Sequence, residues 1–132
     1  MASLADRGKE QVMLTSRHRR ILKRAREIIA KKKHWSREQC ARYRYAKGIY
    51  LPCSPFALEA CQFDAYGALC RAAFEDASDE RTARALADYV ENELPHPLGT
   101  CLVFYNDEHG HKTVLKLFDV ALTYRWSDRS TT

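Results

Sequence analysis

The chain contains 132 residues, of which 45% are hydrophobic and 30% are charged, a composition typical of one globular domain. No apolar run approaches the roughly 20 residues that a membrane-spanning helix needs. The N-terminal residues also lack the apolar core of a secretory signal, so we expect no membrane association and a cytoplasmic location.

The charge is distributed unevenly along the chain. Residues 1–47 contain fifteen basic and four acidic residues, a net charge of +11, whereas residues 48–132 contain seven basic and thirteen acidic residues, a net charge of −6. Such an asymmetry indicates either a surface for nucleic acid or a basic segment that packs against the acidic part of the same fold.

The N-terminal third predicts a flexible segment followed by a basic helix. Residues 1–14 are polar and are expected to be flexible. Thr15 or Ser16 can cap a helix over residues 17–33, whose apolar residues recur at helical spacing. Four of its basic residues lie close to one line on the opposite face: Arg17, Arg20, Arg24 and Lys31.

The middle of the chain predicts an extended segment and then a buried helix. The stretch "ARYRYAKGIYL", residues 41–51, alternates aromatic and basic residues and is a weak signal for a hairpin or an extended segment. Ser54 and Pro55 then favour the start of a helix. Residues 55–75 are apolar on nearly every side of a helical wheel, which predicts the central buried helix of the fold.

The C-terminal part predicts two more helices. Ser78 or Asp79 caps the first of them, and Pro95 and Pro97 end it. The stretch "GTCLVFYND" reads as a short extended segment, residues 113–126 as the last helix, and residues 127–132 as a polar tail. The expected fold is therefore mainly α, a single helical domain over residues 15–126, with about four helices around the central helix and a minor hairpin or extended segment.

The five cysteines predict no metal site. Their number is odd, no two are separated by only two residues, and closely paired ligands are what structural zinc requires. We interpret them as reduced thiols that pack as small hydrophobic groups, and we expect no metal and no cofactor. They are Cys40, Cys53, Cys61, Cys70 and Cys101.

The stretch "NDEHGH" gathers the residue types of a metal or catalytic site. Asn106 and Asp107 are followed by His109 and His111, and Trp35 is a further candidate for a site formed with them. Asn and Asp in front of a helix more often bind backbone amides, so we favour a structural role in which both cap the last helix. The chain contains no phosphate-binding glycine loop and no metalloprotease or serine-hydrolase motif.

Asp64 lies inside the predicted central helix, where a carboxylate needs a partner. A salt bridge to an arginine of the first helix is the interpretation that we favour, and an exposed stripe of the helix is the alternative.

Trp35, Gly48, "ACQFDAYGALCRAA", "FYND" and "VLKLFDVAL" occur in an order that resembles a family of small bacterial and phage proteins of unknown function. The resemblance runs from about Ile21 to Trp126. Relatives often carry Cys where this chain has Asp64, so it implies no shared thiol chemistry. It implies a helical fold and supplies no activity. Its single positions are Trp35, Gly48, Ala60, Phe63, Gly67, Ala68, Asn106, Asp107, Val114, Leu117, Asp119 and Ala121.

Two functions remain open at this point. The first is a non-enzymatic binding or accessory module whose basic N-terminal face contacts nucleic acid or an acidic partner. Its candidate residues are Arg17, Arg20, Arg24, Lys31, Arg42 and Arg44. The alternative is a small enzyme or ligand-binding protein with a site at the Asn106–His111 loop.

Overall fold

Helices and a small antiparallel sheet make up residues 14–124, the part of the chain described by the structure, a computed structural model. The helices are α2 (Ser16–Ile28), α3 (Ala65–Glu75), α4 (Glu80–Asn92), α5 (Leu102–Glu108) and α6 (His111–Thr123). The 3-10 helix η1 covers Lys32–His34, and the strands are β1 (Ala41–Ala46), β2 (Ile49–Pro52) and β3 (Ala60–Phe63). Of the flexible segment expected at residues 1–14, all but Leu14 falls outside the described residues, as does the tail expected at residues 127–132.

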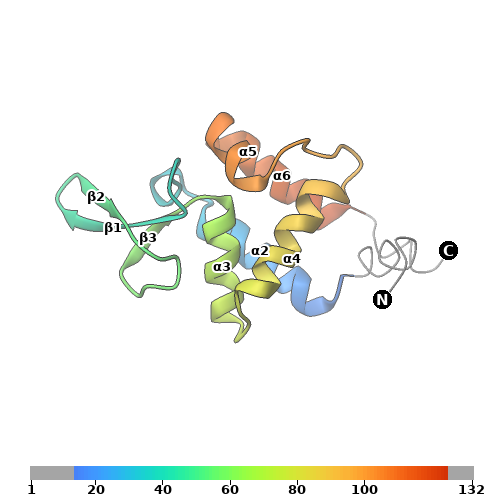
Figure 1. The fold of residues 1–132 in the computed structure, drawn as a ribbon, viewed down its shortest axis with the longest axis horizontal. Coiled ribbons are helices and arrows are strands. Elements are labelled where there is room, and N and C mark those ends of the chain that lie inside the picture. Colours follow the sequence, from blue (N-terminus) through green and yellow to red (C-terminus); the bar gives the residue numbers. More distant parts are fainter. Residues whose placement is uncertain (1–13, 125–132) are drawn as a thin grey trace.

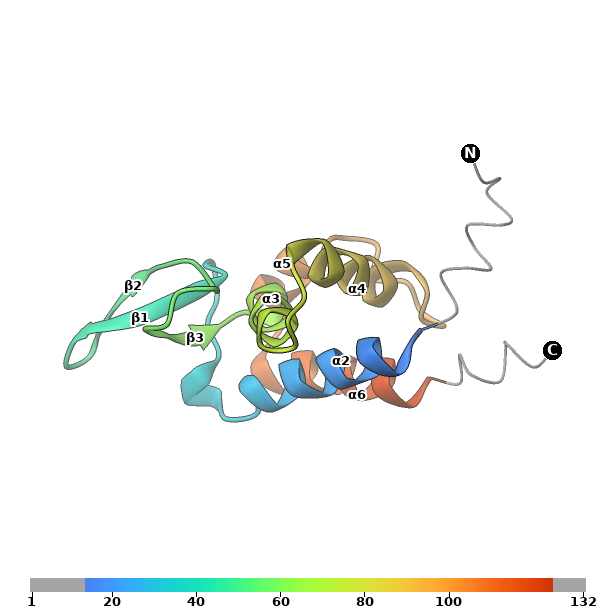
Figure 2. The ribbon, with the colours of Figure 1, turned by 90° about the horizontal axis from the view of Figure 1, so that it is seen from below.

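The helices form two layers that α3 joins (Figures 1 and 2). α2 and α6 lie side by side in one layer, α4 and α5 lie in the other, and α3 packs against α2, α4 and α5. All five helices or their caps contribute large apolar side chains that are fully buried: Ile21, Leu22, Ile29, Leu69, Leu86, Val90, Leu102, Val114 and Phe118. None of the described helices combines the length and the hydrophobicity that a bilayer crossing demands.

A three-stranded antiparallel sheet in the order β2-β1-β3 makes this an α+β fold, so the expectation of a mainly α domain is wrong. The third strand lies in the first half of the segment predicted as one helix over residues 55–75. The chain instead turns at Ser54, whose hydroxyl oxygen accepts the N–H of Phe56 at 3.1 Å, and forms β3 before α3 begins.

A β-bulge explains why β3 resembles a helix in the sequence. Arg42 pairs with Gln62 while the next residue, Tyr43, pairs with Ala60, so β3 has one extra residue, Cys61. Because of this extra residue, Ala60 and Phe63 are both buried although they are three positions apart. A spacing of three is what a helix gives and what a regular strand does not.

A helix also replaces the predicted extended segment near residue 102. α5 begins at Leu102, whose N–H donates to the carboxylate of Glu91 on α4 at 2.6 Å. A side chain from another element therefore supplies the cap that the local sequence lacks. Asn106 and Asp107 consequently lie inside a helix, and the expectation that they form a loop before the last helix is wrong.

The sheet extends away from the helices at one end of the molecule (Figures 1 and 2). Its buried residues lie at the near end, where Ala41 and Phe63 pair, while every residue of β2 is exposed. β1 and β2 join at Lys47 and Gly48, and Gly48 has a φ of +76°, which side chains with a Cβ rarely adopt. The described structure thus consists of a helical body and a projecting sheet.

Backbone contacts at Gly67 fix the direction of this projection. The first turn of α3 lies directly against the backbone of Cys40, just before β1, and the N–H of Asp64 donates to the Cys40 carbonyl oxygen at 3.2 Å. A Cβ at position 67 would overlap that carbonyl oxygen. Only glycine allows the two backbones to approach this closely.

We expect Gly67→Ala to lower the free energy of unfolding by about 3 kcal/mol or more, because neither backbone can move without disturbing the sheet or α3. Chemical denaturation monitored by circular dichroism measures the change. Gly110→Ala is the matched control, since a Cβ at Gly110 meets no atom within 4 Å. Equal stability of the two variants would contradict the contact.

Candidate functional site

The side chain of Asn106 connects three separate segments of the chain. It is fully buried, and its Oδ1 accepts the indole N–H of Trp35 at 2.7 Å and the backbone N–H of Ala65 at 3.0 Å. Its Nδ2 donates to the carbonyl oxygen of Ser36 at 3.0 Å and to Asp107 Oδ1 at 3.3 Å. These four contacts use both hydrogens and both lone pairs of the amide, so Asn106 is fully satisfied.

Asp107 holds the turn that follows Trp35. Its Oδ1 accepts the backbone N–H of Glu38 at 2.8 Å, and Glu38 has a φ of 70°, in the left-handed region. A charged acceptor offsets part of the strain of this conformation. Asn106 and Asp107 therefore bind backbone amides of Ala65 and Glu38, and the expectation that they bind amides at the start of the last helix is wrong.

Each candidate histidine lies beside an aromatic ring, His111 beside Trp35 and His109 beside Tyr105. His111 Nε2 is 2.6 Å from the carbonyl oxygen of Ile29, so this nitrogen carries the proton, and its ring centroid is 5.5 Å from that of Trp35. The ring of His109 stacks on Tyr105 with centroids 4.0 Å apart. The buried Nδ1 of His109 has no hydrogen-bond partner among the described residues.

The structure thus brings the five candidates Trp35, Asn106, Asp107, His109 and His111 together, and the first three join in one hydrogen-bonded group. Among residues 14–124, no three His, Cys, Asp or Glu side chains are placed to hold a metal ion. We interpret the group as the junction between the sheet and the helical body.

Asp64 adds a buried carboxyl group to this junction. It is fully buried as the N-cap of α3, and its Oδ1 accepts the N–H of Gly67 at 2.6 Å. The pKa of Asp64 is raised to about 6, chiefly by burial. The hydrogen bond from Gly67 opposes this rise, and the nearby charge of Asp107 adds to it. The Cys40 thiol also interacts with this carboxyl group, and burial followed by the charge of Asp64 raises the pKa of Cys40 to about 12. No salt bridge from α2 reaches Asp64, so that interpretation is wrong.

The arginines of α2 pair with acidic residues of α3 and α6 instead. Arg17 and Arg20 contact Asp76 Oδ2 at 3.0 and 3.3 Å, and Arg24 contacts Glu75 at 2.7 Å. The hydrogen bonds from Arg20 and Arg17 lower the pKa of Asp76. Three of the predicted binding residues therefore form ion pairs within the protein, two of them with the same carboxylate.

The three other predicted cations lie at the sheet end. Arg42 and Arg44 are two positions apart on β1, so they share one face, opposite Pro52 and Tyr50 of β2 respectively. Arg42 donates to Gln39 Oε1 at 2.8 Å and to the Arg37 carbonyl oxygen at 2.7 Å, whereas Arg44 is exposed. Lys31 is exposed just ahead of η1, and neither Lys31 nor Arg44 forms an ion pair with a described residue.

We name this surface the polar sheet face. Arg42 also pairs with Gln62 of β3, so Gln62 lies on the same face, and Gln62 Nε2 donates to the Lys33 carbonyl oxygen at 3.2 Å. This contact places η1 beside the face. Sequence analysis missed three of its members, Lys33, Tyr50 and Gln62. The position of Tyr50 relative to Arg44 across the Lys47–Gly48 turn could have indicated it. The polar sheet face consists of Lys33, Arg42, Arg44, Tyr50 and Gln62. The side chain of Arg37 does not belong to it, because its guanidinium donates to the His109 carbonyl oxygen at 3.0 Å and lies over the Trp35 ring.

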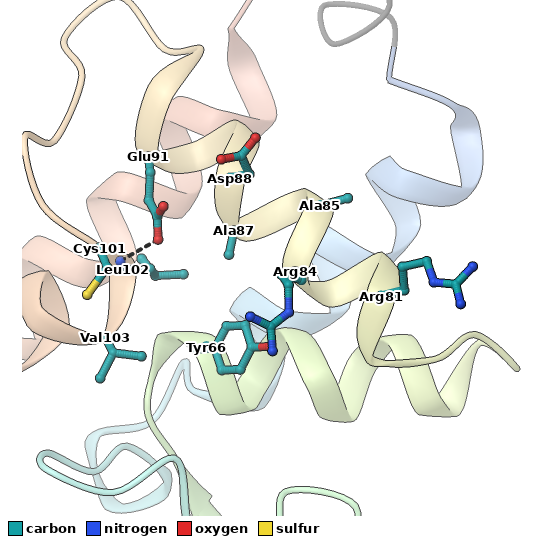
Figure 3. A pocket seen from close by; sticks show the side chains of 10 residues that line it. All are labelled: Tyr66, Arg81, Arg84, Ala85, Ala87, Asp88, Glu91, Cys101, Leu102 and Val103. Carbon is teal, nitrogen blue, oxygen red and sulfur yellow. Dashed lines mark hydrogen bonds between the residues drawn. The ribbon is translucent and has the colours of Figure 1, made fainter. Parts of the chain in front are cut away.

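The structure also contains a groove between α3, α4 and the start of α5, with a volume of about 620 Å³ (Figure 3). Several of its polar groups already have partners within the protein. Tyr66 donates to Glu80 Oε2 at 3.0 Å, Arg84 contacts the same oxygen at 3.2 Å, and Glu91 caps α5. Both signs of charge line the groove, and we assign no ligand to it.

We expect Asn106→Ala to lower the free energy of unfolding by about 3–5 kcal/mol, because it leaves the Trp35 N–H, the Ala65 N–H and the Ser36 carbonyl without this partner. Urea denaturation measures the loss. Asn92→Ala is the control, since exposed Asn92 contacts only Asp88, one turn away, and its loss is expected to stay within about 0.5 kcal/mol. Similar losses in the two variants would contradict the joining role of Asn106.

Asp64 is expected to make stability depend on pH. Its pKa is higher in the folded chain than in the unfolded chain, so the folded state binds the proton more tightly and this contribution is lost as pH rises from about 4 to about 6. Asp64→Asn keeps the capping oxygen and removes the charge. The stability of Asp64→Asn relative to the parent should therefore increase over this pH range and stay constant above it.

Thermal melts of both proteins at several pH values measure this difference. Asp64→Ala, which also removes the cap, is expected to be about 1 kcal/mol less stable than Asp64→Asn at neutral pH. A difference between Asp64→Asn and the parent that does not change with pH would show that Asp64 ionises normally.

Comparison with known proteins gives a family and no activity. The model of a family of unknown function, DUF6197, matches residues 13–124, which include every helix and strand described above. No curated protein and no solved structure matches the chain. The chain therefore belongs to the DUF6197 family, whose function is unknown.

Proposed function

We propose that this protein is a non-enzymatic binding module and that the polar sheet face binds the phosphate backbone of a nucleic acid. The observation that carries the proposal is the placement of Arg42 and Arg44 on one face of a sheet that projects from the helical body, with Lys33 of η1 beside it. Cations that no acidic side chain neutralises attract phosphates over several ångströms and position them by hydrogen bonds.

The distribution of charge in the described chain supports this surface over α2. Residues 31–63, from η1 through β3, contain seven basic and two acidic residues, a net charge of +5. The other described residues, 14–30 and 64–124, contain eleven basic and twelve acidic residues, a net charge of −1. The excess of positive charge therefore belongs to the sheet end, which is where an anionic partner is attracted.

The same charge disfavours pairing between two copies of this chain through their sheets. β2 is an edge strand with every residue exposed, and exposed edges can pair with a second chain. Two copies joined there would bring together two sheet ends, each with a net charge of +5 over residues 31–63. Repulsion between like charges opposes that arrangement. A negatively charged partner meets no such repulsion.

We expect Arg44→Glu with Lys47→Glu to abolish binding to a labelled oligonucleotide, measured by fluorescence anisotropy at low salt. The parent affinity should fall steeply as salt rises, because each phosphate contact releases a counterion. Both side chains are exposed, so the variant should melt at nearly the parent temperature.

Lys23→Glu with Arg81→Glu is the matched control, because it changes the net charge equally and both residues are exposed on the helical body. This control should retain binding. If it loses binding while the sheet variant retains it, α2 and its neighbours bind the anion. If the parent binds no nucleic acid at low salt, the proposal is wrong.

A further inference from the structure

The exposed aromatic residues near the tip of the hairpin are not explained by contacts to phosphate. Tyr45 is 65% exposed and Tyr50 is 39% exposed, and Ile49, the first residue of β2, is 49% exposed. None of them belongs to the hydrophobic core. Exposed rings of this size, grouped beside cations, mark a surface that a partner covers.

The two tyrosines lie next to the cations in the pairing of the strands. Tyr50 is directly opposite Arg44, which places its ring on the polar sheet face beside a guanidinium that forms no ion pair within residues 14–124. Tyr45 has no partner on β2, because the register shifts between Arg44 and Ala46. A bulge of this kind turns a side chain out of the regular alternation and leaves its ring available for contact.

We infer, on the basis of the proposed function, that the partner is a single-stranded nucleic acid whose unpaired bases stack on Tyr45 and Tyr50. Every base has a π-face, and stacking on an aromatic side chain needs no particular sequence. In a duplex the neighbouring base pairs cover these faces, so exposed rings gain nothing from a duplex beyond contact with its backbone. Rings and cations side by side match the alternation of bases and phosphates along one strand.

The size of the sheet limits the length of strand that it contacts. Three strands span about 10 Å across the sheet, and β2 has only four residues. The surface therefore holds a few nucleotides, which agrees with the lower end of the range of site sizes of about 4–16 nucleotides for small single-strand binding modules.

The test compares an oligothymidine of about 16 nucleotides with a duplex of the same length at low salt, using fluorescence anisotropy. We expect the parent to bind the single strand at least about tenfold more tightly than the duplex. Tyr45→Ala with Tyr50→Ala should weaken single-strand binding by about tenfold or more and leave duplex binding and the salt dependence unchanged.

Two further variants separate stacking from other effects. Tyr45→Phe with Tyr50→Phe keeps both rings and should bind the single strand like the parent. Leu58→Ala removes an 88% exposed apolar side chain from the loop before β3 and should also leave binding unchanged.

The outcomes distinguish the inference from the proposed function. Equal binding to single strand and duplex, without an effect of the alanine variant, would overturn the stacking inference and leave phosphate binding by the sheet intact. Absence of binding to both nucleic acids would remove both. Binding to polyglutamate as tight as to oligothymidine would identify an acidic protein as the partner and overturn both as stated.

Discussion

The hydrogen bonds of one buried amide, that of Asn106, determine how the sheet meets the helices. Its oxygen accepts the N–H of Ala65 at the start of α3 and the indole N–H of Trp35, while its nitrogen binds the backbone of Ser36. α5, α3 and the segment leading into β1 therefore meet at one side chain. Because all of these groups are buried or partly buried, water cannot replace a missing partner, and the three segments keep their positions only together.

Local chemistry made some elements predictable. Thr15 caps α2 through a hydroxyl that accepts the N–H of His18. Asp79 caps α4 through its carboxylate, which accepts the N–H of Thr82. Both helices therefore start at or near the predicted residues. The end of α2 was placed too late, since the lysines that follow form η1. Positive charge at the C-terminal end stabilises a helix that apolar contacts already support. It does not lengthen the helix where such contacts are missing.

The errors arose where a partner distant in sequence decides the structure. The sequence of β3 predicts a helix because its bulge puts Ala60 and Phe63, three positions apart, on the buried side. The sequence of α5 predicts an extended segment because the cap of this helix is Glu91 of α4 and not a residue next to it in the chain. The residue types at the junction indicated a polar cluster, but their partners in space could not be read from spacing along the chain. Likewise, the sequence reveals the positive N-terminal charge. Its division into ion-paired arginines on α2 and cations at the sheet that form no ion pair with a described residue depends on the positions of Glu75 and Asp76.

The close contact between Gly67 and Cys40 has a consequence for how this surface can vary. The direction of the hairpin is set by backbone atoms and by the junction behind it, and not by the side chains that the hairpin exposes. Beyond Ala41, the residues of β1 and β2 contribute little to the core, since most of them are exposed. Mutation can therefore change what the hairpin recognises without changing where it points, so that one scaffold can present different recognition surfaces.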